Sequence, residues 1–146
     1  MQVKRAGRIG VVKRKTRSQI VKKLDAVYSQ YIRLDKSDEY GYSECVTCDT
    51  RLHWSELQNG HFISRSKYPT RWHDDNCFPQ CMRCNVFLKG NYIPYTLFMV
   101  DSYTREGVEE LKRLSLQTIK VSTGDLEDRI IHYTAEVKRL KDDKIA

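Results

Sequence analysis

Several features are missing from this sequence of 146 residues, and each absence excludes a class of protein to which the chain could belong. It has no apolar run of 18 or more residues, so we expect no transmembrane helix and no membrane partner. No apolar stretch follows the basic N-terminal residues, so the sequence predicts no secretory signal. There is no internal repeat and no low-complexity tract, and the length fits one domain of ordinary size.

Acidic residues are absent from the first 23 positions, which hold nine Lys or Arg. The net charge of the whole chain is +7, so the positive excess is concentrated at this end. We interpret residues 1–17 as a basic, flexible arm that contacts the phosphates of DNA or RNA. The alternative is a solvated tail that serves only solubility. Residues 18–146 are expected to form a single domain.

Cysteine is scarce, but four of the five cysteines form two Cys-x-x-Cys pairs. The pairs are Cys45 with Cys48 and Cys81 with Cys84, and four thiolates complete a tetrahedral zinc site. Because such a site has no open position for water, we expect a structural Zn²⁺. The fifth, Cys77, is predicted to be a small buried residue. Paired thiols of this kind suit a reducing cytoplasm better than a disulfide scaffold.

Hydrophobic periodicity predicts a helix over about 18–34, followed by a polar connector over 35–43. Two short strands are expected between the cysteine pairs, one near 58–63 and one that approaches Asn76 or Phe78. The second cysteine pair should open a helix that ends near Gly90.

The last third of the chain is predicted to be helical. Pro94 fits the first turn of a short helix, and Thr104 fits the N-cap of a second one. Residues 116–121 are ambiguous and fit an extended linker. Ser122 with Asp125 resembles a capping box, and it precedes an apolar stripe that could pack on the domain or on a second subunit. The stripe consists of Leu126, Ile130, Tyr133, Val137 and Leu140.

Three polar residues follow a regular order around the cysteine pairs. His61 precedes Asn76 by fifteen residues, and Asn85 directly follows the last cysteine of the second pair. Phosphodiester hydrolysis needs a base that activates water and a cation that neutralises charge on the phosphate. In the ββα-metal architecture, a histidine on the first strand is the base, an asparagine before the second cysteine pair braces the loop, and a His or Asn at the start of the helix holds the divalent metal. The order here is similar to that plan. On this likeness we interpret His61 as the general base, Asn76 as a brace of the loop that orients it, and Asn85 as a ligand of a catalytic divalent metal.

This order resembles that of HNH-type nucleases, in a His-Asn-Asn variant, and more closely the NinG/Rap recombination proteins of lambdoid phages. The motifs that carry the resemblance are Gly60–Arg65 (GHFISR), Thr70–Trp72 (TRW), Gln80–Asn85 (QCMRCN), Cys45–Cys48 (CVTC) and Tyr31–Leu34 (YIRL). The endonuclease VII type of phage resolvase is similar in placing an Asn directly after its last zinc cysteine, where it helps to hold magnesium.

The resemblance implies an α+β fold with a small ββα-metal (HNH or His-Me finger) zinc-bound core. That core would span 45–91, with a helix and connector at 18–44 and helices at 92–146. It also implies a structure-selective endonuclease that uses Mg²⁺ or Mn²⁺ to cut branched DNA such as Holliday junctions and D-loops. Symmetric cutting of a four-way junction needs two active sites, so a homodimer is expected. The expected location is the cytoplasm, which is that of the host cell if the chain is phage-encoded.

One position departs from the pattern of those nucleases, which have an acidic residue or a second His just before the base. Here that position is Gly60, so the second ligand of the catalytic metal would come from Asp75, Asp74, His73 or water. Basic residues surround the motif, and we expect some of them to contact phosphates. They are Arg65, Lys67, Arg71, Arg83 and Lys89.

Two other functions remain open at this point. An HNH endonuclease of the homing or restriction type would share the same core chemistry. A non-catalytic zinc module could bind nucleic acid through the basic arm alone. The His61, Asn76 and Asn85 set favours an enzyme, because a pure binding module has no need of it.

Overall fold

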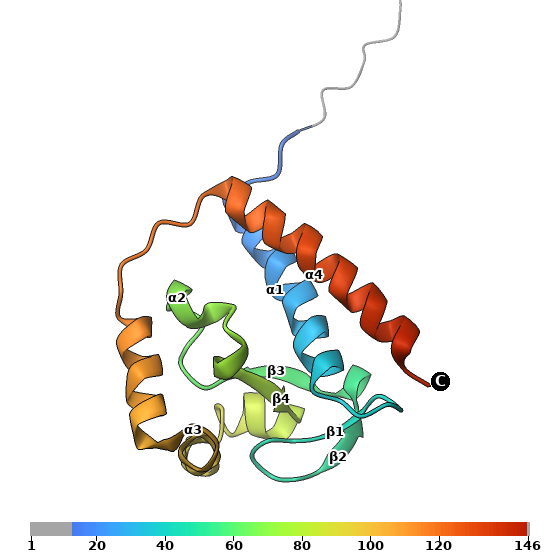
Figure 1. Cartoon of the computed structure of the whole chain (residues 1–146), viewed down its shortest axis with the longest axis vertical. Coiled ribbons are helices and arrows are strands. Elements are labelled where there is room, and N and C mark those ends of the chain that lie inside the picture. The colour runs from blue at the N-terminus through green and yellow to red at the C-terminus, as the bar shows by residue number, and fades with distance from the viewer. Residues whose placement is uncertain (1–12, 146) are drawn as a thin grey trace, which may run out of the picture.

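A computed structural model describes residues 13–145, and it has an α+β architecture of helices and two small antiparallel sheets (Figure 1). The elements are α1 (Arg17–Asp35), β1 (Tyr42–Glu44), β2 (Arg51–His53), η1 (Trp54–Glu56), β3 (Gln58–His61), α2 (Tyr68–Arg71), η2 (Asp74–Asn76), β4 (Cys77–Gln80), η3 (Arg83–Phe87), α3 (Tyr92–Ser115) and α4 (Thr123–Asp143). None of the described helices is apolar over a length that could cross a bilayer. Residues 1–12, which hold most of the predicted basic arm, lie outside the described residues.

The helices α1 and α4 lie side by side and run in the same direction (Figure 1). Helix α1 begins after Thr16, which forms a capping box with Gln19. Its buried residues recur at helical spacing, and Leu24 and Leu126 of α4 share one core cluster. The predicted helix at 18–34 is confirmed, and the apolar stripe of α4 packs on α1 of the same chain.

Two hairpins lie beneath this helix pair. Strands β3 and β4 pair antiparallel with His61 opposite Cys77 and Gln58 opposite Gln80, close to the two strands expected from the sequence. The β1–β2 hairpin, which brackets the first cysteine pair, was not expected. Its strands have three residues each, too few to display an alternating pattern of polar and apolar side chains.

The last third of the chain follows the predicted order of segments. Helix α3 is broken at Thr104, where φ is 66° and ψ is 167°, and the Thr104 hydroxyl accepts from the backbone N–H of Gly107 at 3.3 Å. Thr104 thus caps the second half of α3, as predicted. An extended linker follows, and Ser122 and Asp125 form the predicted capping box at the start of α4.

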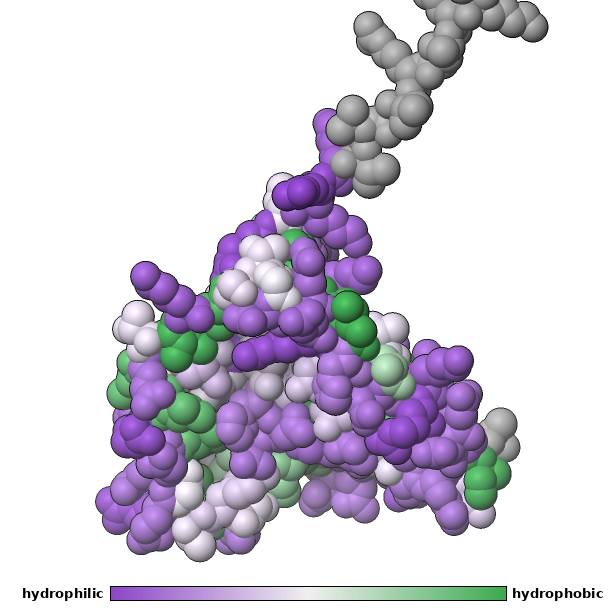
Figure 2. All heavy atoms as spheres, turned by 45° about the horizontal axis from the view of Figure 1, so that its top comes forward, coloured by the Kyte–Doolittle hydropathy of each residue, from purple (hydrophilic) through white to green (hydrophobic). Residues whose placement is uncertain are grey.

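The surface is mostly hydrophilic on the face shown in Figure 2, with scattered apolar groups between the polar ones. The core is accordingly small and divided into four clusters of buried residues. One of them consists mainly of the paired cysteines together with Leu57. The packing in this part of the chain is therefore made largely by cysteine side chains.

Candidate functional site

The four paired cysteines converge on one point. The sulfur atoms of Cys45, Cys48, Cys81 and Cys84 all lie within 4.8 Å of one another, and the Cys48 and Cys81 sulfurs are 3.7 Å apart. Tetrahedral zinc with Zn–S bonds of about 2.3 Å places its sulfurs about 3.8 Å apart. The cluster could therefore hold a metal ion such as zinc.

Polar groups around this cluster complement thiolate sulfur. The backbone N–H of Cys84 donates to the Cys81 sulfur at 3.5 Å, and the Asn91 amide donates to the Cys84 sulfur at 3.6 Å. Burial raises the pKa of Cys81 to about 12, whereas at Cys45 hydrogen bonds, first of all from Thr47, outweigh burial and lower the pKa to about 6. Four thiols this close cannot all ionise without a cation among them.

A cavity of about 430 Å³ opens beside the β3–β4 hairpin and brings together two of the three predicted catalytic residues. His61 from the end of β3 and Asn85 from η3 both line it. The remaining lining residues are Asp25, Ser29, Asn59, Ser64, Arg65, Lys89, Gly90 and Tyr92. The cavity is thus mainly polar and carries both signs of charge.

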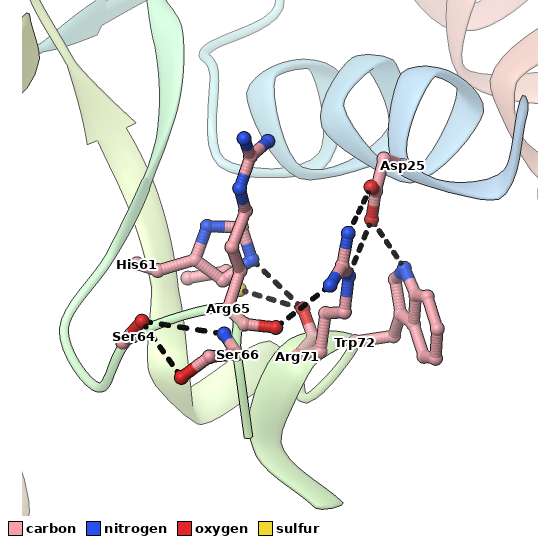
Figure 3. Close-up of polar contacts among 8 residues, drawn as sticks. Asp25, His61, Ser64, Arg65, Ser66, Arg71 and Trp72 are labelled. Atoms are coloured by element: carbon pink, nitrogen blue, oxygen red, sulfur yellow. Dashed lines mark hydrogen bonds and ion pairs between the residues drawn. The ribbon is translucent and has the colours of Figure 1, made fainter. Parts of the chain in front are cut away.

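The orientation of His61 is fixed by a backbone carbonyl. Its Nε2 lies 2.8 Å from the carbonyl oxygen of Arg71 (Figure 3). A carbonyl oxygen only accepts, so Nε2 carries the proton and the unprotonated nitrogen of the neutral ring is Nδ1. Burial lowers the pKa of His61 below its ordinary value of 6.5, which keeps the ring neutral at physiological pH. A half-buried neutral imidazole with one free lone pair is the form a general base requires.

Asn76 is completely buried and braces the loop that carries the Arg71 carbonyl. Its side-chain oxygen accepts from the backbone N–H of Ile63 at 2.7 Å, and its amide donates to the carbonyls of Ile63 and Thr70 at 2.9 and 3.0 Å. These bonds tie the two ends of the loop together. The geometry agrees with the bracing role expected of Asn76, while its part in any reaction stays a prediction.

Asn85 lies in the middle of η3, which is a single turn of π-helix in place of the longer helix expected after the second cysteine pair. The Asn85 amide nitrogen donates to the Gln58 side chain at 2.8 Å. Its side-chain oxygen has no hydrogen-bond partner among residues 13–145, so it is free to accept a ligand at the cavity. π-turns of this kind occur often at functional sites.

Gly60 occupies the position at which the similar nucleases have an acidic residue or a second His. It has no room for a side chain. A Cβ atom there would lie 2.6 Å from both Cγ and Cδ of Gln80 and closer still to its Oε1. Gln80 is fully buried, and its amide donates to the Thr47 hydroxyl and the Gly90 carbonyl. With the Gln80 side chain in this place, position 60 has no room for an acidic side chain.

The acidic candidates for a second metal ligand lie elsewhere. The carboxylate of Asp75 accepts from the Tyr103 hydroxyl at 3.1 Å and does not line the cavity with His61. Asp74 accepts from the hydroxyls of Tyr28 and Tyr31 of α1. The Nδ1 of His73 accepts from the backbone of Asp75 at the start of η2. The structure therefore brings none of these three groups to the cavity.

The five basic residues expected at DNA fall into different environments. Arg65 and Lys89 are exposed and line the cavity, and Lys67 and Arg83 are exposed outside it. Arg71 differs, because its guanidinium is mostly buried and paired with Asp25. Arg71 thus has a partner within the protein that the sequence did not suggest.

A family model described as "Bacteriophage Lambda NinG protein" matches residues 2–143. The chain belongs to the NinG family. It is 27% identical over 99 residues to Protein ninG of Escherichia phage lambda, an alignment that covers 67% of this chain and 46% of that protein. It is 24% identical over 131 residues to Protein ninG of Salmonella phage P22, covering 89% of this chain and 62% of that protein.

The chain spans about half the length of the lambda and 933W NinG proteins that it matches. No solved structure matches it significantly. The NinG part of the resemblance noted from the sequence is therefore confirmed, and the match includes α1 and the C-terminal helices as well as the cysteine-rich region.

One charged residue that lines the cavity in this NinG-family chain, Asp25, was not predicted from the sequence. Asp25 lies in α1, one helical turn from Ser29, which lines the cavity too. Both residues directly follow members of the buried stripe, Leu24 and Tyr28. A polar pair at i and i+4 on the edge of a buried helix face was the available signal.

Proposed function

We propose that the protein is a metal-dependent DNA endonuclease of the HNH type that acts on branched recombination intermediates such as Holliday junctions and D-loops. The choice of branched DNA as substrate follows from the resemblance to the NinG/Rap recombination proteins. The observation that carries the proposal is the contact of His61 Nε2 with the Arg71 carbonyl, which leaves Nδ1 as an acceptor in a cavity shared with Asn85. The order β3, β4, η3 supports a ββα-metal core within one zinc-bound domain over 18–146.

In the proposed reaction, His61 Nδ1 accepts a proton from a water molecule as the water oxygen attacks the phosphorus atom. The bond between phosphorus and the leaving sugar oxygen breaks, and that oxygen is protonated from solvent. The side-chain oxygen of Asn85 would hold Mg²⁺ or Mn²⁺, which would neutralise charge on the phosphate and on the leaving oxygen. Arg65 and Lys89 at the cavity would contact neighbouring phosphates.

The cysteine cluster is proposed to hold one structural Zn²⁺. Four sulfurs at tetrahedral spacing leave no position for water, so this metal would take no part in hydrolysis. It would join the β1–β2 hairpin to the segment that carries Asn85, because Cys84 immediately precedes that residue. The zinc would therefore set the position of the metal ligand relative to His61.

A second copy of the chain is the proposed protein partner. Helix α3 exposes Ile93, Leu97 and Val100 at helical spacing, and their exposed fractions are 80%, 63% and 38%. Phe87 of η3, just upstream, is 72% exposed. This apolar face begins beside Lys89 and Tyr92, which line the cavity. A dimer formed through this face would bring two cavities near one branch point of a DNA junction. The proposed location of this reaction is the cytoplasm of the host cell.

Cleavage of a four-way junction, compared with its linear duplex arms and with or without Mg²⁺ or Mn²⁺, tests the proposed function. The wild type should cut the junction faster than the arms and only with the metal. His61→Ala should lose about 10²–10⁴-fold in rate while it keeps zinc and DNA binding. His132→Ala, at an exposed histidine of α4, is the matched control.

Asn85→Ala separates the metal ligand from the base. Its lost activity should be partly restored at higher metal concentration, whereas that of His61→Ala should not, because a cation does not replace a proton acceptor. Cleavage by His61→Ala at the wild-type rate would refute the assignment and favour a zinc module that only binds nucleic acid. Equal cutting of junction and linear DNA at a fixed sequence would favour the homing or restriction type.

A further inference from the structure

Asp25 lies in α1, outside the segment that carries the cysteine pairs and His61. Its carboxylate nevertheless lines the same cavity as His61. Among the described residues that line this cavity it is the one acidic side chain. A carboxylate beside a candidate base either binds something in the cavity or holds part of its wall, and its contacts decide between the two.

Those contacts fill the carboxylate of Asp25. Its Oδ1 accepts from Arg71 Nε at 3.0 Å and from Trp72 Nε1 at 2.9 Å, and its Oδ2 accepts from Arg71 Nη2 at 2.5 Å (Figure 3). The pairing with Arg71 is a two-point fork, which fixes the guanidinium in direction as well as in position. The side chains of Asp25 and Arg71 are only 23% and 15% exposed, so solvent competes weakly with this pair.

The backbone of the same arginine holds the base. The carbonyl oxygen of Arg71 contacts His61 Nε2 at 2.8 Å, while the Nη1 atom of its side chain donates to the Arg65 carbonyl at 2.9 Å. From the other side, the Asn76 amide holds the preceding carbonyl, that of Thr70. Asp25 of α1 therefore binds the side chains of the turn that orients His61, and Asn76 of η2 binds its backbone.

We propose that Asp25 is a positioning residue for His61: by holding the side chains of Arg71 and Trp72, it fixes the Arg71 carbonyl that orients the imidazole. The proposal rests on the proposed function, in which His61 is the base. Asp25 acts through Arg71 and touches no reacting atom. Loss of its grip lets the turn shift, and a displacement of about 1 Å at a catalytic group can cost about 10²-fold in rate.

The charge of Asp25 adds a second effect that a purely structural ion pair far from the site would lack. Burial is the largest cause that lowers the pKa of His61; the charges of Arg71 and Arg65 lower it too, and the charge of Asp25 raises it. The other ionisable groups nearby are Lys89 and Tyr92, which line the cavity, and Cys77. Burial raises the pKa of the Cys77 thiol to about 12, so this thiol stays neutral. Removing the carboxylate charge should lower the pKa of His61 further.

The test compares Asp25→Asn with Asp25→Glu in the zinc-loaded protein of residues 1–146. Asparagine keeps the size but replaces one acceptor oxygen with a donor and removes the charge. Glutamate keeps both oxygens and the charge. NMR titration of His61 reports its pKa and its tautomer without any DNA, and cleavage of a four-way junction reports kcat and KM.

For Asp25→Asn we expect a lower His61 pKa, a loss of the single Nε2–H tautomer, and a kcat that falls about 10²-fold with little change in KM. Asp25→Glu should retain the wild-type pKa of His61 and recover part of kcat. Asp38→Asn is the matched control, since Asp38 also pairs with an arginine, Arg51, but does not line the cavity. It should leave the His61 titration and kcat unchanged.

A wild-type His61 titration and kcat in folded Asp25→Asn would overturn the proposal. If that variant fails to fold, Trp72→Phe removes one donor to Asp25 and keeps an aromatic ring in the core. It should then show a smaller loss of kcat, and a wild-type kcat would again overturn the proposal. If the wild type cuts no DNA but its His61 still responds to Asp25→Asn, the proposed function fails while the coupling of the two residues stands.

Discussion

Replacing Gly60 by alanine tests whether packing, and not chance, keeps a side chain off the position before His61. The new Cβ would lie 2.6 Å from Cγ and Cδ of Gln80, far inside ordinary carbon–carbon contact. Gln80 cannot swing away freely, since it is fully buried and its amide holds the Thr47 hydroxyl and the Gly90 carbonyl at 3.1 and 2.9 Å. Tyr95 closes the same region by donating to the Gly60 carbonyl at 2.6 Å.

The expected loss of stability follows from these contacts. Overpacking a well-filled core costs about 1–3 kcal/mol. If the buried amide nitrogen of Gln80 loses its partners, that costs about 1–3 kcal/mol more. Against this, replacing glycine stabilises by about 0.4–1 kcal/mol through the unfolded chain. We therefore expect Gly60→Ala to lower the free energy of unfolding by about 2–4 kcal/mol, a large part of the stability of a small domain.

Gln80→Ala provides the background in which this reasoning can fail. With the Gln80 side chain removed, the clash disappears, and Gly60→Ala should become neutral or slightly stabilising. Equilibrium unfolding in urea with zinc in excess, followed by the fluorescence of Trp54 and Trp72, measures all four proteins of the cycle. An equal cost of Gly60→Ala in both backgrounds would refute the packing explanation for the missing acid.

The further predictions concern the metal, the pH dependence and the basic arm. Elemental analysis should find about one zinc per chain, and a chelator should unfold the protein; a folded sample without metal would contradict the zinc assignment. The rate of cleavage should fall on the acid side with a midpoint below 6.5, since burial lowers the pKa of His61 and only the neutral ring accepts a proton; a midpoint above 6.5 would contradict the burial argument. The same lowered pKa means that His61 contributes stability above pH 6.5, which is lost as pH falls through its folded pKa. Deleting residues 1–15 should weaken DNA binding and flatten the dependence of log K on log salt, and an unchanged slope would show that the arm does not contact DNA.

Features governed by neighbours in the chain were predictable from the sequence. The stripe of α1 and the capping box of α4 follow from residue spacing alone, and the structure confirms both. The cysteine pairs likewise predict a cluster that could hold a metal ion, and the structure brings their four sulfur atoms together. His61 and Asn85 were placed at one site by resemblance, and they do line one cavity.

Features that depend on distant contacts were not predictable in the same way. Asp25 meets Arg71 across 46 positions of sequence, and no local pattern encodes that pairing. The expected ligand Asp75 failed to reach the cavity because η2 turns its carboxylate toward Tyr103 of α3. The π-turn of η3 is equally hidden, since its residues fit an ordinary helix.

These contacts explain why the helices outside the cysteine-rich region matter to the site. Strands β3 and β4 have four residues each, and an isolated two-stranded hairpin is marginally stable in water. The cysteine cluster can secure the end of the hairpin that holds Gln58 and Gln80, but His61 lies at the opposite end, paired with Cys77. That end is held by α1, through Asp25 and through the packing of Cys77 and Trp72 against its buried face. The orientation of the candidate base is therefore a property of the hairpin and α1 together, and a metal at the cysteines alone would not be enough to set it.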